Sequence, residues 1–115
     1  MEFEKGICER IVKLDPQILI AALIDEKGES KDWYVRQGVV VPDDTRSEKM
    51  AQQTLIMMSI VRTAADYLGE VQYIHTRMSK MDVIHFGYGK GVMAVVLNRP
   101  YDEKALTAKI LEGLR

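Results

Sequence analysis

Residues 47–69 read SEKMAQQTLIMMSIVRTAADYLG, a long stretch with no glycine or proline before its last position. At about 100° per residue it predicts one continuous helix, with an apolar line that we expect to face the core. That line comprises Met50, Met57, Val61, Ala64 and Leu68, with Met58 and Ala65 beside it. Asp43, Asp44 and Ser47 are candidate N-caps, and Gly69 is expected to end the helix in a left-handed turn.

The same helix carries a second apolar flank, formed by Ile56, Ile60 and Tyr67. Few polar residues separate the two flanks. They are Gln52, Ser59, Arg62, Thr63 and Asp66, with Leu55 among them. A helix that is apolar on two sides needs a second partner besides its own sheet, so this flank predicts an interface.

Outside the helix, five segments have the residue pattern of β-strands. Residues 18–24 and 91–97 are apolar at nearly every position, which is typical of strands covered on both faces. We therefore expect these two strands side by side at the centre of a sheet that has helices on both faces. The more polar segments 31–37, 71–77 and 81–86 are expected to lie outside them, with hairpin turns at the glycines between strands.

Two shorter helices are expected at the ends of the chain. Residues 3–14 place Phe3, Ile7, Ile11 and Leu14 at helical spacing, with Cys8 expected as a small buried hydrophobe. Near the other end, a helix capped by Asp102 has an apolar side. Its members are Ala105, Leu106, Ile110, Leu111 and Leu114. The predicted order is helix, two strands, long helix, three strands, helix.

Composition narrows the class of protein. The 115 residues are 47% hydrophobic, and we expect residues 1–115 to form one domain. Sixteen Lys and Arg against 17 Asp and Glu give a net charge of −1 without a block of one sign, so nucleic-acid binding is not expected. The single cysteine, the acidic start and the lack of a long apolar run predict a cytoplasmic protein without a membrane span.

The chain resembles the roadblock/dynein light-chain family along its whole length. The residues that carry the resemblance are the hairpin at 20–28, the long helix, the glycine-rich turn at 87–91 and the strand at 92–97. It implies an α+β, profilin-like fold: a five-stranded antiparallel sheet with the long helix on one face and both terminal helices on the other. Longin and other profilin-like sheets share much of this plan and remain alternatives.

The resemblance also implies a mode of action. Members of the family dimerise by pairing the strand after the long helix edge to edge and laying the long helices side by side, and many bind or regulate small Ras-like GTPases. Carried over to this chain, the implied homodimer interface comprises Ile56, Ile60, Tyr67, Val71, Tyr73, His75 and Arg77. The solvent face of the paired helices is the implied GTPase surface, with Gln52, Leu55, Ser59 and Arg62.

The search for catalytic chemistry leads to no enzyme hypothesis and no cofactor. The glycines from 87 to 91 lie between strands, so they indicate a hairpin turn rather than a phosphate loop. His75 and His85 are possible cross-strand neighbours, but without a third ligand nearby they are expected to be structural histidines rather than a metal site. Arg62 is interpreted as a helix arginine near Asp66 rather than an arginine finger.

The leading hypothesis is a non-enzymatic, homodimeric roadblock-type regulator or scaffold for a Ras-like GTPase. Two alternatives remain open. One is a small-ligand sensor with a pocket between sheet and long helix, as profilin-like folds can form. The other is a subunit of a heteromeric roadblock complex, paired with a different chain of the same fold.

Overall fold

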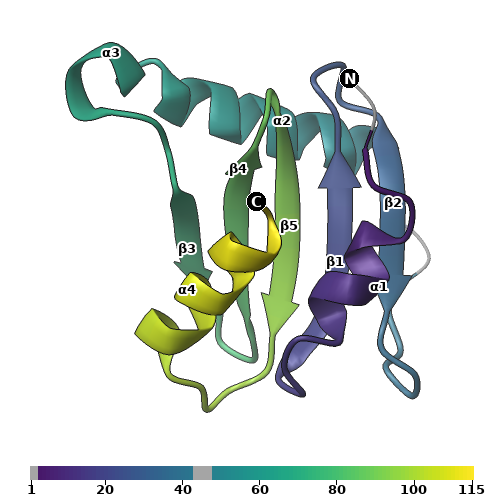
Figure 1. The fold of residues 1–115 in the computed structure, drawn as a ribbon. Helices are drawn as coiled ribbons and strands as arrows, with labels where there is room; N and C mark the ends of the chain where they lie inside the picture. Colours follow the sequence, from purple (N-terminus) through teal and green to yellow (C-terminus); the bar gives the residue numbers. More distant parts are fainter. Residues whose placement is uncertain (1–2, 43–47) are drawn as a thin grey trace.

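A computed structural model describes residues 3–42 and 48–115 of the chain, which form an α+β fold built on one five-stranded sheet. The elements are α1 (Ile7–Val12), β1 (Ile18–Ile24), β2 (Ser30–Val35), α2 (Glu48–Arg62), α3 (Ala65–Leu68), β3 (Tyr73–Arg77), β4 (Asp82–Tyr88), β5 (Gly91–Leu97) and α4 (Glu103–Gly113). Helix α2 crosses one face of the sheet, and α1 and α4 cover the other (Figure 1). The predicted fold class is confirmed.

The strand order is β2-β1-β5-β4-β3, and every neighbouring pair is antiparallel. The two nearly all-apolar strands, β1 and β5, lie side by side at the centre with the predicted bounds. Continuous apolar strands are buried on both faces, and this is the physical reason that the pattern identified them. Strands β2 and β3 form the two edges of the sheet.

The main hydrophobic core lies between the sheet and the terminal helices. It comprises Ile7, Cys8, Ile11, Val12, Ile18, Ala21, Leu23, Ile84, Phe86, Met93, Val95, Leu97, Leu106 and Ile110. Cys8 is fully buried, with its Sγ 3.9 Å from the Sδ of Met93, which confirms its prediction as a small buried hydrophobe. None of these core residues comes from α2. The α1/α4 face of the sheet therefore supplies most of the packed interior.

Turns and caps follow local chemistry that the sequence shows. Between β1 and β2, one carboxylate oxygen of Asp25 accepts hydrogen bonds from the backbone amides of Lys27 and Glu29, both at 2.9 Å. A side chain at Gly91 is excluded, because its Cβ would lie 2.2 Å from the carbonyl oxygen of Ile24. At the start of α4, Asp102 accepts from the backbone amide of Ala105 at 3.0 Å, so this predicted N-cap is confirmed.

Several predicted bounds differ from the structure. The first helix is shorter than residues 3–14, and the second strand begins and ends earlier than residues 31–37. The fourth strand extends past residue 86 to Tyr88, because its pairing with β5 continues to the turn. The candidate N-caps Asp43, Asp44 and Ser47 lie outside the described residues.

The predicted continuous helix over 47–69 is wrong in one respect, because it is interrupted after Arg62. The Thr63 hydroxyl donates to the carbonyl oxygen of Ile60 at 2.7 Å, and the Thr63 amide donates to the same oxygen at 3.3 Å. The Ala64 amide likewise bonds three residues back, to Val61. A hydroxyl that competes for backbone groups in this way ends the regular helical ladder. A short helix, α3, follows and ends at Leu68. Gly69 closes it with a positive φ of 93°, but its ψ of 174° is extended, so the predicted left-handed helical turn is not the one observed.

Candidate functional site

Six large apolar side chains of α2 and α3 are exposed to solvent. They are Met50, Ile56, Ile60, Val61, Tyr67 and Leu68, and we call them the helix apolar face. Tyr67 is 89% exposed, Leu68 74% and Ile60 65%. The predicted second flank, Ile56, Ile60 and Tyr67, thus lies on the surface. Exposed apolar side chains that gather on one element, rather than scattering singly, are typical of an interaction site.

The side of α2 that faces the sheet differs from the predicted one. The buried residues of the helix are Ala51 and Met58, whereas Met50, Val61 and Leu68 of the predicted core line are exposed. At about 100° per residue the buried side is roughly a quarter turn from that line. Periodicity detects apolar stripes, but it does not determine which stripe a helix turns toward its sheet.

Contacts with two hairpin turns explain the observed orientation of α2. At the β1–β2 turn, Gly28 has φ 80°, and a Cβ there would lie 3.0 Å from Cγ of Gln52 and 3.6 Å from Cδ2 of Leu55. The helix therefore passes directly over this glycine. At its other end, Arg62 reaches the β4–β5 turn.

The Arg62 guanidinium donates to three carbonyl oxygens of that turn. Nη1 lies 3.0 Å from the oxygen of Lys90, and Nη2 lies 3.3 Å from that of Gly89 and 2.8 Å from that of Gly91. A charged group that donates to several carbonyls fixes the end of a helix firmly. The interpretation of Arg62 as a solvated partner of Asp66 is therefore wrong. These three contacts hold α2 against the sheet.

The predicted GTPase surface is divided by this arrangement. Gln52 and Ser59 are exposed, whereas Leu55 and Arg62 are half-buried and directed at turns of their own chain. The Ser59 hydroxyl donates to the carbonyl oxygen of Leu55 within the helix. Sequence spacing alone placed all four on one polar wedge, and the structure leaves two of them at the surface.

Strand β3 is an edge of the sheet and follows α3 on the same side of the molecule (Figure 1). The predicted pairing strand began at Val71, but the observed strand begins at Tyr73. The Tyr73 ring packs within the chain against the ring of Phe86, with the centroids 5.8 Å apart and the planes tilted by 45°, and His75 joins a polar network under α4. Arg77 is exposed. Of the predicted edge residues, Tyr73 and His75 thus turn their side chains toward their own core.

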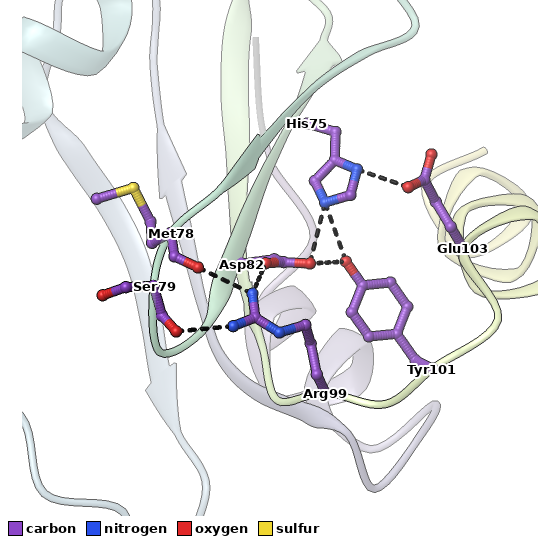
Figure 2. Close-up of polar contacts among 7 residues, drawn as sticks. All are labelled: His75, Met78, Ser79, Asp82, Arg99, Tyr101 and Glu103. Atoms are coloured by element: carbon purple, nitrogen blue, oxygen red, sulfur yellow. Dashed lines mark hydrogen bonds and ion pairs between the residues drawn. The ribbon is translucent and has the colours of Figure 1, made fainter.

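The network around Asp82 joins β3, β4 and the segment before α4, and Figure 2 shows Asp82 at its centre. Asp82 is 2% exposed. Its Oδ2 accepts from the hydroxyl of Tyr101 at 2.5 Å and lies 3.1 Å from Nε2 of His75. Its Oδ1 accepts from Arg99, and the other ring nitrogen of His75 lies 2.6 Å from Glu103. Arg99 also donates to two carbonyls of the β3–β4 turn. Every member of the cluster has a partner, as a buried polar group requires.

These contacts shift the protonation of two members of the network. The Tyr101 hydroxyl contributes most to lowering the pKa of Asp82, burial opposes it, and His75 and Arg99 add to it, so the pKa falls to about 2. Burial, together with the Asp82 carboxylate, raises the pKa of Tyr101. Asp82 is therefore a carboxylate at neutral pH, and the network is a stable anchor for the edge strand.

The two histidines lie on opposite faces of the sheet. His75 pairs with Ile84 and contacts the α4 side, whereas His85 pairs with Ile74 and points to the α2 side. Their prediction as cross-strand neighbours is wrong, because adjacent strands place them one register position apart. In the described part of the chain, no group of three or more His, Cys, Asp or Glu side chains is placed to hold a metal ion.

Between α2 and the sheet lies a cavity of about 140 Å³. Its lining is mostly apolar. The lining residues are Ile20, Ala22, Ile24, Ser30, Trp33, Met50, Ala51, Thr54, Val83, His85, Ala94 and Val96. His85 is 9% exposed, and burial lowers its pKa. Among the described residues, its Nδ1 and the Ser30 hydroxyl have no hydrogen-bond partner. The sequence analysis kept a pocket at this place open under the ligand-sensor alternative, but it named none of the lining residues, although the alanines within two otherwise large-residue strands were a signal for them.

No described helix has both the length and the apolar composition that crossing a membrane requires. No protein-family model matches the sequence, and no curated protein is detectably similar to it.

Solved structures are similar in fold over nearly the whole chain. A Roadblock/LC7 domain from Streptomyces avermitilis superposes with a TM-score of 0.76 at 17% identity, covering 98% of this chain and 92% of that one. MglB from Myxococcus xanthus gives 0.76 at 19% identity, with 98% and 91% covered. MglB in a tetrameric arrangement gives 0.69 at 18% identity, with 97% and 90% covered. The chain therefore has the roadblock/LC7 fold.

Proposed function

We propose that this protein is a homodimeric, non-enzymatic regulator or scaffold of the roadblock type, and that its dimer binds a small Ras-like GTPase. The observation that carries the proposal is the helix apolar face, exposed beside the unpaired edge of β3. Both features are liabilities for a lone subunit, because exposed edges and apolar patches promote association. The proposal needs no cofactor and assigns no catalytic residue.

A second copy of the chain covers both features by one two-fold operation. Edge-to-edge pairing of β3 with the β3 of the other copy gives a continuous sheet, in which the backbone groups of both strands find partners. The same operation brings the two copies of α2 together on the face of the sheet that α2 occupies. Ile56, Ile60 and Tyr67 are the proposed helix contacts, and Val71, Tyr73, His75 and Arg77 are the proposed edge segment. The tetrameric arrangement of MglB supports assembly as a property of this fold.

The dimer is tested by the solution mass of the pure protein, measured by light scattering over a dilution series. We expect the mass of two copies for the native chain. Ile60→Asp places a charge in the middle of the proposed contact, and we expect one copy, because an unpaired buried carboxylate is strongly disfavoured. Ser59→Asp is the matched control, because Ser59 is an exposed neighbour on the same helix outside the helix apolar face. It should remain a dimer.

A native chain that stays monomeric at every concentration contradicts the homodimer. Mixing it with other chains of the same fold from its genome would then test the heteromeric alternative. A dimer that Ile60→Asp leaves intact contradicts the proposed contact, even if the mass is that of two copies.

The GTPase step is proposed from the fold and from the exposed polar residues of α2 beside the helix apolar face. Gln52 and Ser59 remain the candidates for direct contact, and Leu55 and Arg62 are proposed to shape the surface from beneath it. Immobilised native dimer should capture a purified small GTPase of the same genome in one nucleotide state in preference to the other. Gln52→Arg combined with Ser59→Arg should abolish capture without changing the dimer mass. Absence of capture in both nucleotide states contradicts this step alone.

A further inference from the structure

The floor of the cavity under α2 is set by the strand register. Trp33 on β2 pairs with Ala22, Ala22 pairs with Ala94, and Ala94 pairs with His85 on β4. Two methyl groups therefore lie between two large planar side chains on four adjacent strands. With strands about 4.8 Å apart, the backbones of Trp33 and His85 are roughly 14 Å from each other. The result is a shallow slot whose floor has no large side chain to fill it.

Helix α2 covers this slot without filling it. The helix contributes Met50, Ala51 and Thr54 to the lining, and its fixed contacts at the two turns hold it above the alanines. A well-packed interior has few voids larger than a water molecule, and the volume here is about 140 Å³. An apolar cavity of about 150 Å³ in another protein stays dry and binds benzene. The available space is therefore that of one small aromatic ring.

The slot also has hydrogen-bonding capacity that the described residues do not use. His85 is nine-tenths buried, and neither its Nδ1 nor the Ser30 hydroxyl has a partner there. Because burial keeps the imidazole neutral, the ring presents one donor and one acceptor nitrogen. An unpaired polar atom inside an apolar site is costly, so a ligand that pairs with it gains affinity. None of the described residues that line the cavity is charged, so among them nothing favours a carboxylate or a phosphate as the ligand.

We propose that the cavity between α2 and the sheet is a binding site for a small, uncharged, planar aromatic compound with one hydroxyl group, of the phenol class. The ring occupies the slot above Ala22 and Ala94, between Trp33 and His85, and the hydroxyl pairs with Nδ1 of His85. This site shares Met50 with the helix apolar face, but none of the proposed dimer contacts or GTPase-surface residues lines it.

The protein contains one tryptophan, Trp33, and it lines the site, so its fluorescence reports occupancy directly. The native protein is titrated with phenol, benzene and cyclohexanol, with excitation at the red edge of the tryptophan band. We expect a saturable change with phenol, weaker binding of benzene by about tenfold, and no saturable change with cyclohexanol, whose puckered ring does not fit the slot. A rise in melting temperature with phenol concentration checks the binding by an independent route.

Two variants distinguish the contribution of the slot's shape to binding from that of the His85 imidazole. Ala94→Leu fills the floor and should abolish the phenol response, while Ala108→Leu, on the exposed side of α4, should leave it unchanged. His85→Phe should weaken phenol about tenfold and leave benzene unchanged. Circular dichroism verifies that each variant is folded, and Ala22→Val replaces Ala94→Leu if the latter is not.

The proposal is overturned if the native protein shows no saturable response to phenol up to millimolar concentration. It is also overturned if the filled variant responds like the native protein, since the signal then comes from the surface. Equal binding of phenol and cyclohexanol rejects the planar slot. An unchanged phenol affinity in His85→Phe rejects the role of Nδ1.

Discussion

The two faces of the sheet are packed to different degrees. On the α1/α4 face, Ile84, Phe86, Met93 and Val95 are all fully buried. On the α2 face, α2 buries Ala51 and Met58 and covers a cavity, and six large apolar side chains of α2 and α3 are exposed. The contrast shows that one face of the sheet supplies the packed interior, whereas the other keeps exposed apolar surface and unfilled space.

Polar groups differ between the faces in the same way. Asp82, on the α1/α4 face, is bonded by Tyr101 and Arg99 and approached by His75. His85, three residues further along β4 and on the α2 face, has a buried nitrogen without a partner among the described residues. A satisfied network makes a rigid anchor, whereas an unsatisfied group inside a cavity is typical of a site that awaits a ligand.

The largest effect is expected from a matched pair of truncations on β5. Val95 is fully buried on the α1/α4 face, and its neighbour Val96 is half-buried on the α2 face beside the cavity. Val95→Ala should lower the free energy of unfolding by about 2–3 kcal/mol, and Val96→Ala by about 1 kcal/mol. Urea denaturation measures the two free energies of unfolding. Both variants are compared at the same protein concentration, because the stability of any oligomer depends on it.

The two substitutions remove the same atoms from the same strand, so each is the control of the other. Equal losses of stability would contradict the comparison and show that the α2 face is packed as tightly as the other. A larger loss of stability in Val96→Ala than in Val95→Ala would show that the α2 face is the more tightly packed one.

The sequence predicted the packed face far better than the open one. The continuous apolar runs of β1 and β5 fixed their bounds and their central position, and Asp102 marked the start of α4. These features are local or depend on burial on both faces, which a residue pattern records directly. The edge strands, which are more polar and pair on one side, were placed correctly but with shifted ends.

What sequence reasoning missed on the α2 face depends on contacts between distant residues. The orientation of α2 is set by Gly28 and by the carbonyls that Arg62 reaches across 27 to 29 positions of the chain. The cavity depends on Ala22 facing Ala94 across the β1–β5 register. Neither follows from periodicity, since a helix with two apolar stripes satisfies the pattern in more than one orientation.

The second effect tests what holds α2 in place. Arg62→Met keeps the length and apolar stem of the side chain but removes its donors to Gly89, Lys90 and Gly91. We expect the free energy of unfolding to fall by about 1–2 kcal/mol, because charged hydrogen bonds at a partly exposed turn are lost. Lys49→Met is the control, since Lys49 is an exposed cation on the same helix.

Hydrogen exchange distinguishes a local effect from a global one. Amides in the last turn of α2 should exchange faster in Arg62→Met, while those of β5 follow the global change in stability. Unchanged exchange at the end of α2 would show that apolar contacts hold the helix. The α2 face of the sheet would then be more rigid than its looser packing suggests.

The smallest effect is expected only at acidic pH, and it concerns the Asp82 network on the α1/α4 face. Because the folded pKa of Asp82, about 2, lies below the ordinary value of 3.8, the folded state binds fewer protons than the unfolded state in this range. The contribution of the Asp82 carboxylate is therefore fully present above pH 3.8 and is lost as the pH falls through 2. Tyr101→Phe removes the largest cause of the shift, so the pKa of Asp82 should rise toward 3.8 and the loss should begin at higher pH. Carboxyl chemical shifts of Asp82, followed by NMR from pH 5 downward, resolve this group from the other acids, including Asp25, whose pKa is also lowered. If the Asp82 titration is the same in both proteins, the hydroxyl does not hold the carboxylate, and the packed face owes its edge anchor to Arg99 and His75 instead.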